Sequence, residues 1–232
     1  MSEERPPGPR ECAGGLRVDL GGGACWFGTE AAGDFTDPPP ARLEALGSAL
    51  GLAGRSFARA TQVHGSSVRV VSDPSEAVPG EGYDGQLTGS TEVVCAVRVA
   101  DCLPVAIASP GAAGVLHAGW RGLAAGVLEA GVRALVSIAP GEVTAVIGPG
   151  ARACCYEAGP EVHAAFAGLG SGARVGDMAD LPWIATEKLR EMGVSDVLDC
   201  GICTICSTGP RWHSYRRDHD EAGRSLALAW RN

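Results

Sequence analysis

The 232-residue sequence predicts one domain of the α+β class, with mixed α and β structure, and three observations support this. Apolar residues make up 45% of the chain and charged residues 20%, which is typical of a globular protein with a sizeable core. Short apolar runs typical of buried strands are interspersed with segments of helical periodicity. No internal repeat and no low-complexity linker divides the sequence, so we expect residues 16–232 to fold as one unit after a flexible tail at 1–15.

The N-terminal half begins with two apolar runs, at 16–20 and 24–28, and the glycines between them predict a hairpin. A helix is expected after a turn-rich stretch, because Leu43, Leu46 and Leu50 recur at helical spacing. Further strands are expected at 68–71, 93–99, 105–108 and 114–117, with a loop at 74–85 and a polar break at 100–104.

The C-terminal half starts with an amphipathic pattern that predicts a helix over 123–138. A strand at 143–147 ends at a Gly-Pro-Gly sequence. Early prolines indicate helices over 160–169 and 182–192, and Gly193 is a natural stop for the second. The closing strands are expected at 194–198 and 225–230.

Charge and hydropathy exclude several partners. Nineteen Lys and Arg residues against 27 Asp and Glu give a net charge of −8, so a broad nucleic-acid surface is not expected. No apolar run reaches the ~18 residues that span a bilayer. The first 15 residues lack the apolar core of a signal peptide, so we expect a cytoplasmic protein without a membrane partner. The nine cysteines are expected to be reduced.

Three residues have the chemistry of metal ligands. His64 and His117 lie in short glycine-flanked segments, and Cys102 lies in the polar break between apolar strands. Two imidazoles and a thiolate suit a tetrahedral ion such as zinc, and three protein ligands would leave one position for water or substrate. The spacing alone is no compact metal motif, so a buried structural cysteine and two hydrogen-bonded histidines explain these residues equally well.

The segments TQVHG, VADCLP, LHAGWRG, IGPG, CCYE and SYRRD, in this order, resemble the laccase-domain family, also described as multicopper polyphenol oxidase-like or purine nucleoside phosphorylase proteins. The resemblance covers about residues 55–230, and HAGWRG with an upstream ADC is its most specific part. It implies a four-layer α/β/β/α sandwich with a cleft near strand ends. It also implies that His64, Cys102 and His117 are the catalytic residues and bind one zinc ion, copper being an alternative.

The resemblance implies phosphorolysis of adenosine, inosine and 5′-methylthioadenosine, with adenosine deamination as a further activity. Purine nucleoside and phosphate are then the expected partners, and the protein is expected to be a monomer or homodimer. A hydrolase that edits peptidoglycan precursors at the same metal site and a metal-holding protein without activity remain alternatives. A copper-dependent polyphenol oxidase is disfavoured, because one metal lacks the several coppers that four-electron oxygen reduction requires.

Arg121, Tyr215 and Arg216 are the expected substrate-binding residues. Arg121 lies where a helix is expected to begin, so its guanidinium and the free N–H groups of the helix would face an anion together. Arg216 and Arg217 are consecutive, and in an extended segment at most one of them would face the site.

Two features depart from these patterns. Glu30 stands where family members usually carry the arginine of F-x-T-R-x-G-G, and if that arginine holds an anion, phosphorolysis is weakened here.

Cys203 and Cys206 resemble half of a zinc ribbon, but the sequence has no second CxxC, so a second metal is not expected. The adjacent Cys154 and Cys155 are expected to pack in the core or in a cleft wall.

Overall fold

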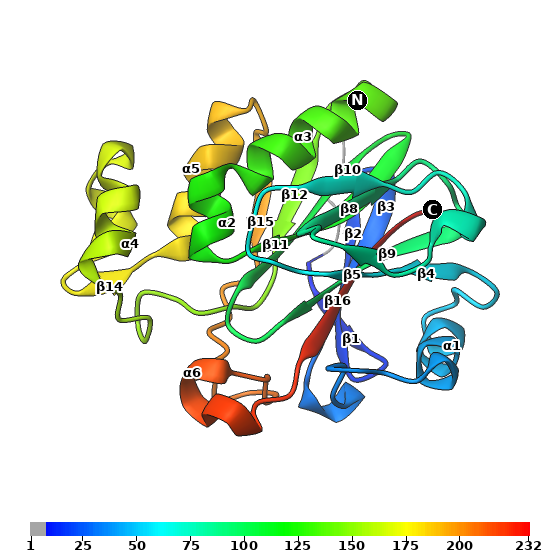
Figure 1. Cartoon of the computed structure of the whole chain (residues 1–232), viewed down its shortest axis with the longest axis horizontal. Coiled ribbons are helices and arrows are strands. Elements are labelled where there is room, and N and C mark those ends of the chain that lie inside the picture. Colours follow the sequence, from blue (N-terminus) through cyan, green and yellow to red (C-terminus); the bar gives the residue numbers. More distant parts are fainter. Residues whose placement is uncertain (1–7) are drawn as a thin grey trace.

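Two six-stranded sheets form the centre of the computed structural model, which describes residues 8–232 (Figure 1). The first sheet has the order β1 (Arg10–Cys12), β2 (Gly15–Leu20), β3 (Gly23–Gly28), β16 (Ser225–Arg231), β9 (Val93–Val99) and β4 (Ser56–Ala58). The second sheet has the order β15 (Asp196–Asp199), β12 (Thr144–Ile147), β10 (Leu103–Ser109), β11 (Ala112–Ala118), β8 (Gly85–Thr88) and β6 (Val68–Val70). In these two sheets, most of the neighbouring strands that the structure describes are antiparallel, and the outermost pairs at β4, β6 and β15 are parallel.

The two sheets pack face to face through small and medium apolar side chains. Alternate residues of one strand serve opposite faces: Val97 of β9 lies between the sheets, whereas Val94 and Ala96 face outward. In β10, likewise, Ala106 lies between the sheets and Ile107 faces outward. Both faces of each central strand are therefore buried, which explains why these strands read as continuous apolar runs.

Helices cover the two outer faces, so the expected four-layer α/β/β/α arrangement is confirmed. Helix α1 (Pro40–Ala49) packs its leucines against the first sheet. Helices α2 (Trp120–Ala125), α3 (Val127–Ile138) and α5 (Leu181–Glu191) cover the second sheet (Figure 1).

The remaining elements are short and lie at the periphery. They are the helices α4 (Pro160–Ala165) and α6 (Tyr215–Asp218), the strand pairs β5 (Ala60–Thr61) with β7 (Gly80–Glu81) and β13 (Arg174–Val175) with β14 (Met178–Ala179), and the 3₁₀ turns η1 (Glu30–Ala32), η2 (Pro74–Glu76), η3 (Ala167–Leu169), η4 (Ser171–Ala173) and η5 (His219–Glu221). Across residues 8–232, none of the helices combines the length and apolar character needed to cross a bilayer.

Several expectations are corrected by this arrangement. The helix expected over 123–138 is two helices, because Gly126 adopts a left-handed φ of 90° and interrupts the α-helical hydrogen bonds. The expected tail at 1–15 is too long, since Arg10–Cys12 pairs with β2, while residues 1–7 lie outside the described residues. Strand β8 begins at the end of the loop expected at 74–85, and strand β4 was not expected at all.

Candidate metal centre and substrate cavity

His64, Cys102 and His117 come from three separate parts of the chain and meet at one point. Their ligand atoms all lie within 4.8 Å of one another. The two imidazole rings meet edge to face with centroids 4.7 Å apart. The structure therefore brings together the three residues that the sequence motifs single out.

The topology of the second sheet explains the meeting of Cys102 and His117. Strands β10 and β11 form an antiparallel hairpin in which Pro104 pairs with His117 and Leu103 pairs with Ala118. Cys102 directly precedes Leu103, so the hairpin brings it beside His117. Gly119 packs directly against Cys102 and His64, since a Cβ atom on this glycine would lie 2.8 Å from Cys102 Sγ and 3.3 Å from His64 Cδ2.

A buried carboxylate, Asp84, orients the His117 ring and holds the backbone of the loop that carries His64. Its Oδ1 atom lies 2.7 Å from Nδ1 of His117, and its oxygens accept the backbone N–H groups of Val63, His64 and Gly65 at 3.2, 2.9 and 2.7 Å. With Nδ1–H donating to the carboxylate, Nε2 of His117 is left with a lone pair for a metal. Asp84 is absent from the expected site residues, because nothing in its local sequence distinguishes it from other polar loop residues.

The surroundings of Cys102 and His117 favour a thiolate beside a protonated imidazole before a metal binds. Burial alone would raise the pKa of the Cys102 thiol, but hydrogen bonds and charge from His117 and His64 outweigh burial and lower it to about 6. Burial would lower the pKa of His117, whereas hydrogen bonds with Asp84 and Cys102, together with their negative charge, raise it to about 9. Burial likewise works against the charge of Asp84, but its bonds to His117 and to the Gly65 N–H keep its pKa below the usual value. A metal would therefore displace a proton as it binds.

The donor set fits a borderline-soft ion. Two imidazole nitrogens and one thiolate sulfur are ligands that zinc accepts in catalytic sites, and copper takes the same donors. Asp101, which flanks Cys102, takes no part in the group of donor atoms. Its carboxylate instead accepts hydrogen bonds from the Thr204 hydroxyl and from the backbone N–H of Arg216, both at 2.6 Å.

A cavity of about 770 Å³ opens beside the three ligands. It is lined by His64, Cys102 and His117 themselves, by the aromatic residues Trp120, Tyr156 and Tyr215, by the arginines Arg98, Arg121, Arg216 and Arg224, and by Thr36, Gln62, Ala100, Asp101, Leu181 and His219. Among the described residues that line the cavity, Asp101 is the only acidic one. The cavity thus has an apolar and aromatic body with a concentration of positive charge.

All three expected substrate-binding residues line this cavity. The Arg121 guanidinium lies over the Trp120 ring, 4.4 Å from its centroid, and the Arg216 guanidinium lies 5.2 Å from the Tyr156 ring centroid. Tyr215 is half exposed at the cavity mouth. Arg98 and Arg224 also line the cavity but are not among the expected site residues. Arg98 could have been recognised in the sequence, because it is the single charged residue in the apolar run of β9.

Arg217 is absent from the cavity lining, but not because an extended segment alternates its side chains, as expected. Residues 215–218 form the helix α6 rather than an extended segment. The Arg217 guanidinium donates to the carbonyls of Thr204 and Trp212 and pairs with Asp218 at 2.6 Å. It is therefore committed to holding the C-terminal segment.

Glu30 does not face the cavity. Its Oε1 atom accepts hydrogen bonds from Arg211 at 2.9 Å and from Arg217 at 3.1 Å. The carboxylate thus ties η1 to the C-terminal segment, and it is absent from the residues that line the cavity. The structure gives Glu30 an ion-pairing role rather than contact with a bound anion.

Comparison with known proteins agrees with this architecture. A family model described as multi-copper polyphenol oxidoreductase laccase matches residues 32–232. A protein of Aquifex aeolicus named purine nucleoside phosphorylase is 38% identical over 144 residues, which are 62% of this chain and 68% of that protein. A protein of Deinococcus radiodurans with the same name is 36% identical over 194 residues, which are 79% of this chain and 73% of that protein. The crystal structure of YlmD from Geobacillus stearothermophilus has a TM-score of 0.83 at 25% identity and covers 96% of this chain and 98% of YlmD.

Proposed function

The chain belongs to the multi-copper polyphenol oxidoreductase laccase family, and we propose that it is a metal-dependent purine nucleoside phosphorylase that also deaminates adenosine. Relatives named purine nucleoside phosphorylase support the first activity. The observation that carries the proposal is the set of four arginines beside the His64, Cys102 and His117 centre.

Arg98, Arg216 and Arg224 each use one guanidinium nitrogen to donate to backbone carbonyls, which leaves their other N–H groups for a bound anion. Among residues 8–232, none of Arg98, Arg121, Arg216 and Arg224 forms a salt bridge with a carboxylate. A chain with a net charge of −8 thus concentrates unpaired positive charge in one cavity. Planar guanidinium groups bind phosphate oxygens through paired N–H donors. The cavity is therefore suited to a phosphate dianion.

The rest of the lining suits a nucleoside. A volume of about 770 Å³ lies within the usual range for small-molecule sites. Trp120, Tyr156 and Tyr215 offer aromatic faces on which a purine stacks. Adenosine, inosine and 5′-methylthioadenosine share this purine and a ribose, and we propose them as the substrates.

Phosphorolysis needs the phosphate held against ribose C1′ while the glycosidic bond breaks and the purine leaves. The arginines would hold and orient the phosphate oxygens, and the aromatic side chains would hold the purine. Their positive charge would also stabilise the negative charge that builds up near the reacting centre. The phosphate forms the new bond to C1′, and the purine leaves with the electron pair of the glycosidic bond and takes up a proton. The products are the free purine and ribose 1-phosphate, or 5-methylthioribose 1-phosphate when the substrate is 5′-methylthioadenosine.

Deamination is supported by a separate observation: within residues 8–232, the donor group that meets at the centre consists of three protein ligands. A bound zinc ion would supply Lewis acidity and lower the pKa of water near the purine C6. His64, Cys102 and His117 would hold the ion, and Asp84 would keep His117 in the tautomer with Nε2 free. We further propose a cytoplasmic location, because all nine cysteines are unpaired thiols, as in reducing compartments.

The test is incubation of the purified, metal-loaded protein with adenosine, with and without phosphate. Ribose 1-phosphate and adenine that form only with phosphate support phosphorolysis, and inosine formed without phosphate supports deamination. A Cys102→Ala variant should lose the metal of the His64, Cys102 and His117 centre and both activities, whereas a variant of the exposed helix residue, Arg133→Ala, should keep them. Formation of neither product by the metal-loaded protein would refute the proposal and favour the peptidoglycan hydrolase or the inactive metal-holding protein.

A further inference from the structure

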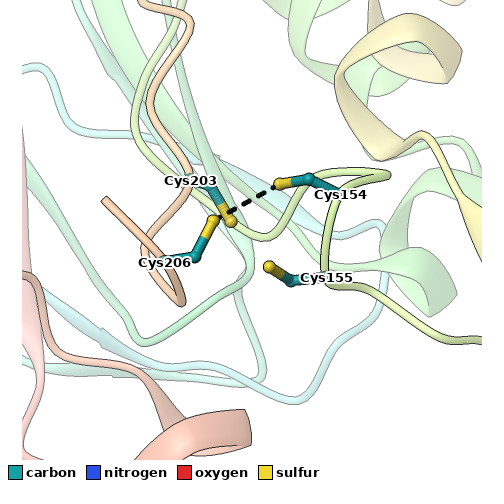
Figure 2. Close-up of side chains that lie close together, drawn as sticks. All are labelled: Cys154, Cys155, Cys203 and Cys206. Carbon is teal, nitrogen blue, oxygen red and sulfur yellow. Dashed lines mark hydrogen bonds between the residues drawn. The ribbon is translucent and has the colours of Figure 1, made fainter. Parts of the chain in front are cut away.

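Four cysteines from two loops face one another outside the cavity (Figure 2). Cys154 and Cys155 lie between β12 and α4, and Cys203 and Cys206 lie after β15. Their sulfur atoms all lie within 4.8 Å of one another, and the Sγ atoms of Cys154 and Cys206 are 3.6 Å apart. Cys154 is exposed rather than packed in the core, and neither it nor Cys155 is among the residues that line the cavity, so their expected places are corrected. The adjacent pair lies beside the CxxC that has no second half in the sequence.

We propose that these four cysteines bind a structural zinc ion, independent of the His64, Cys102 and His117 centre. A tetrahedral zinc with Zn–S bonds of about 2.3 Å places its sulfurs about 3.8 Å from one another. The observed separation of 3.6 Å between Cys154 and Cys206 is close to that edge length. Four protein sulfurs complete the tetrahedron and leave no open position, which is the mark of a structural rather than a catalytic site.

A disulfide explains the cluster less well. It requires two sulfurs about 2.05 Å apart and would leave the other two thiols converging without a partner. All four residues are free thiols in the structure. The zinc site uses every one of them.

The backbone already holds the two loops in register. Gly150 and Cys203 form a parallel β-bridge, in which Thr204 N–H donates to the Gly150 carbonyl at 3.1 Å. Arg152 of the first loop adds a two-bonded ion pair, at 2.8 and 2.7 Å, with Asp199 at the end of β15, the strand that leads into the second loop. The four thiols are therefore brought together by other contacts, so little further ordering is needed for a metal to bind.

Each loop also carries a residue that lines the cavity or hydrogen-bonds to a residue of its lining. Tyr156 directly follows Cys155 and packs under the Arg216 guanidinium. Thr204, between Cys203 and Cys206, donates its hydroxyl to Asp101, the neighbour of Cys102. A zinc ion between the loops would therefore hold this side of the cavity in place.

The test measures metal content in a full-length background that lacks the first centre, His64→Ala/Cys102→Ala, so that its outcome does not depend on the proposed function. Protein purified under reducing conditions should retain one zinc ion per chain. Adding Cys206→Ser should abolish that zinc, and adding Cys200→Ser, a nearby cysteine outside the cluster, should leave it. Cobalt in the same background should give the intense visible absorption of tetrahedral cobalt thiolates, again lost with Cys206→Ser.

A second measurement needs no cluster variant and covers the case in which Cys206→Ser fails to fold. Titrating the background protein with a mercurial thiol reagent should release its zinc to a chromogenic chelator as the cluster thiols are blocked. Absence of zinc from the background protein, iron in its place, or zinc that persists in folded protein with Cys206→Ser would overturn the proposal. A Cys154–Cys206 disulfide found by mass spectrometry of the reduced-purified protein would overturn it as well.

Discussion

Asp84 acts at the scale of a single residue, because one buried carboxylate serves both a ligand ring and the loop of a second ligand. We expect Asp84→Asn to weaken zinc binding at the His64, Cys102 and His117 centre by about 10- to 100-fold, as loss of a carboxylate partner typically does. Competition with a chelator of known affinity measures this. The control is Asp19→Asn, which removes a carboxylate from a surface ion pair instead. Unchanged affinity in Asp84→Asn would show that the carboxylate has no part in metal binding.

The Cys102 thiol provides a pH-dependent readout. Its pKa is lowered to about 6, so in metal-free protein the reactive thiolate predominates at neutral pH and is lost only as the pH falls through about 6. We expect the rate of iodoacetamide labelling at Cys102 to stay high down to that pH and to fall below it. Peptide mass spectrometry measures the labelling, with Cys95 as an internal control, because burial raises the pKa of its thiol to about 12. Labelling that appears only above pH 8, as for an ordinary thiol, would contradict the expected pKa.

Arg121 distinguishes the two proposed reactions. Arg121→Ala should raise the KM for phosphate and lower phosphorolysis by about ten- to a hundredfold, since a charge-assisted contact is worth roughly 1.5–3 kcal/mol. Deamination should fall less, because it needs no phosphate. Initial rates of adenine and inosine formation across a phosphate titration measure this, with Arg133→Ala as the control. Equal losses in both reactions would instead assign Arg121 to purine binding or to the fold.

At the scale of elements, the start of helix α2 is packed directly onto the metal centre. Gly119 caps this helix, and a methyl group there would lie only 2.8 Å from Cys102 Sγ and 3.3 Å from His64 Cδ2. We expect Gly119→Ala to displace the thiol and reduce zinc content while the protein stays folded. Metal analysis together with circular dichroism checks this. Gly209→Ala is the matched control, because the space around that glycine is open. Full zinc content in Gly119→Ala would show that the centre tolerates this displacement.

Elements with strong periodicity are the ones that the sequence predicts well. Strand β9 occupies its expected residues, and the β2–β3 hairpin forms as expected, because buried strands produce long apolar runs. Strand β4 has only three residues, and β8 contains Gly85, Gln86 and Thr88, so neither stands out from a loop. The break between α2 and α3 depends on one glycine, Gly126, whose conformation the apolar pattern does not reveal.

The candidate site is predictable only in part, for a related reason. The metal ligands lie in distinctive motifs, so resemblance identifies them. Asp84 and Arg224 reach the site through strand pairing and through the path of the C-terminal segment. The cysteine cluster needs two loops about 50 residues apart to meet, and sequence spacing alone does not reveal this.

At the scale of the whole molecule, stability depends on the layer between the two sheets. Phe27 lies there, is 1% exposed, and packs so tightly that a Cβ atom on Gly148 would meet its ring at 2.6 Å. Phe27→Ala should lower the free energy of unfolding by about 3–5 kcal/mol, because it leaves a cavity in a rigid interior. Urea denaturation measures this, with the exposed Val175→Ala as the control. A change below ~1 kcal/mol would show that the sheets repack around the gap.

The place of β16 in the first sheet has a consequence for how the protein is made. This strand is the last in the chain, yet it lies between β3 and β9, and Ala227 pairs with Phe27 about 200 positions earlier. While the chain emerges from the ribosome, β3 and β9 are synthesised early but have no partner along these edges. The edges of β3 and β9 that pair with β16 therefore stay unpaired until Ser225–Arg231 has emerged. The sheet therefore cannot reach its full strand order before β16 has been synthesised.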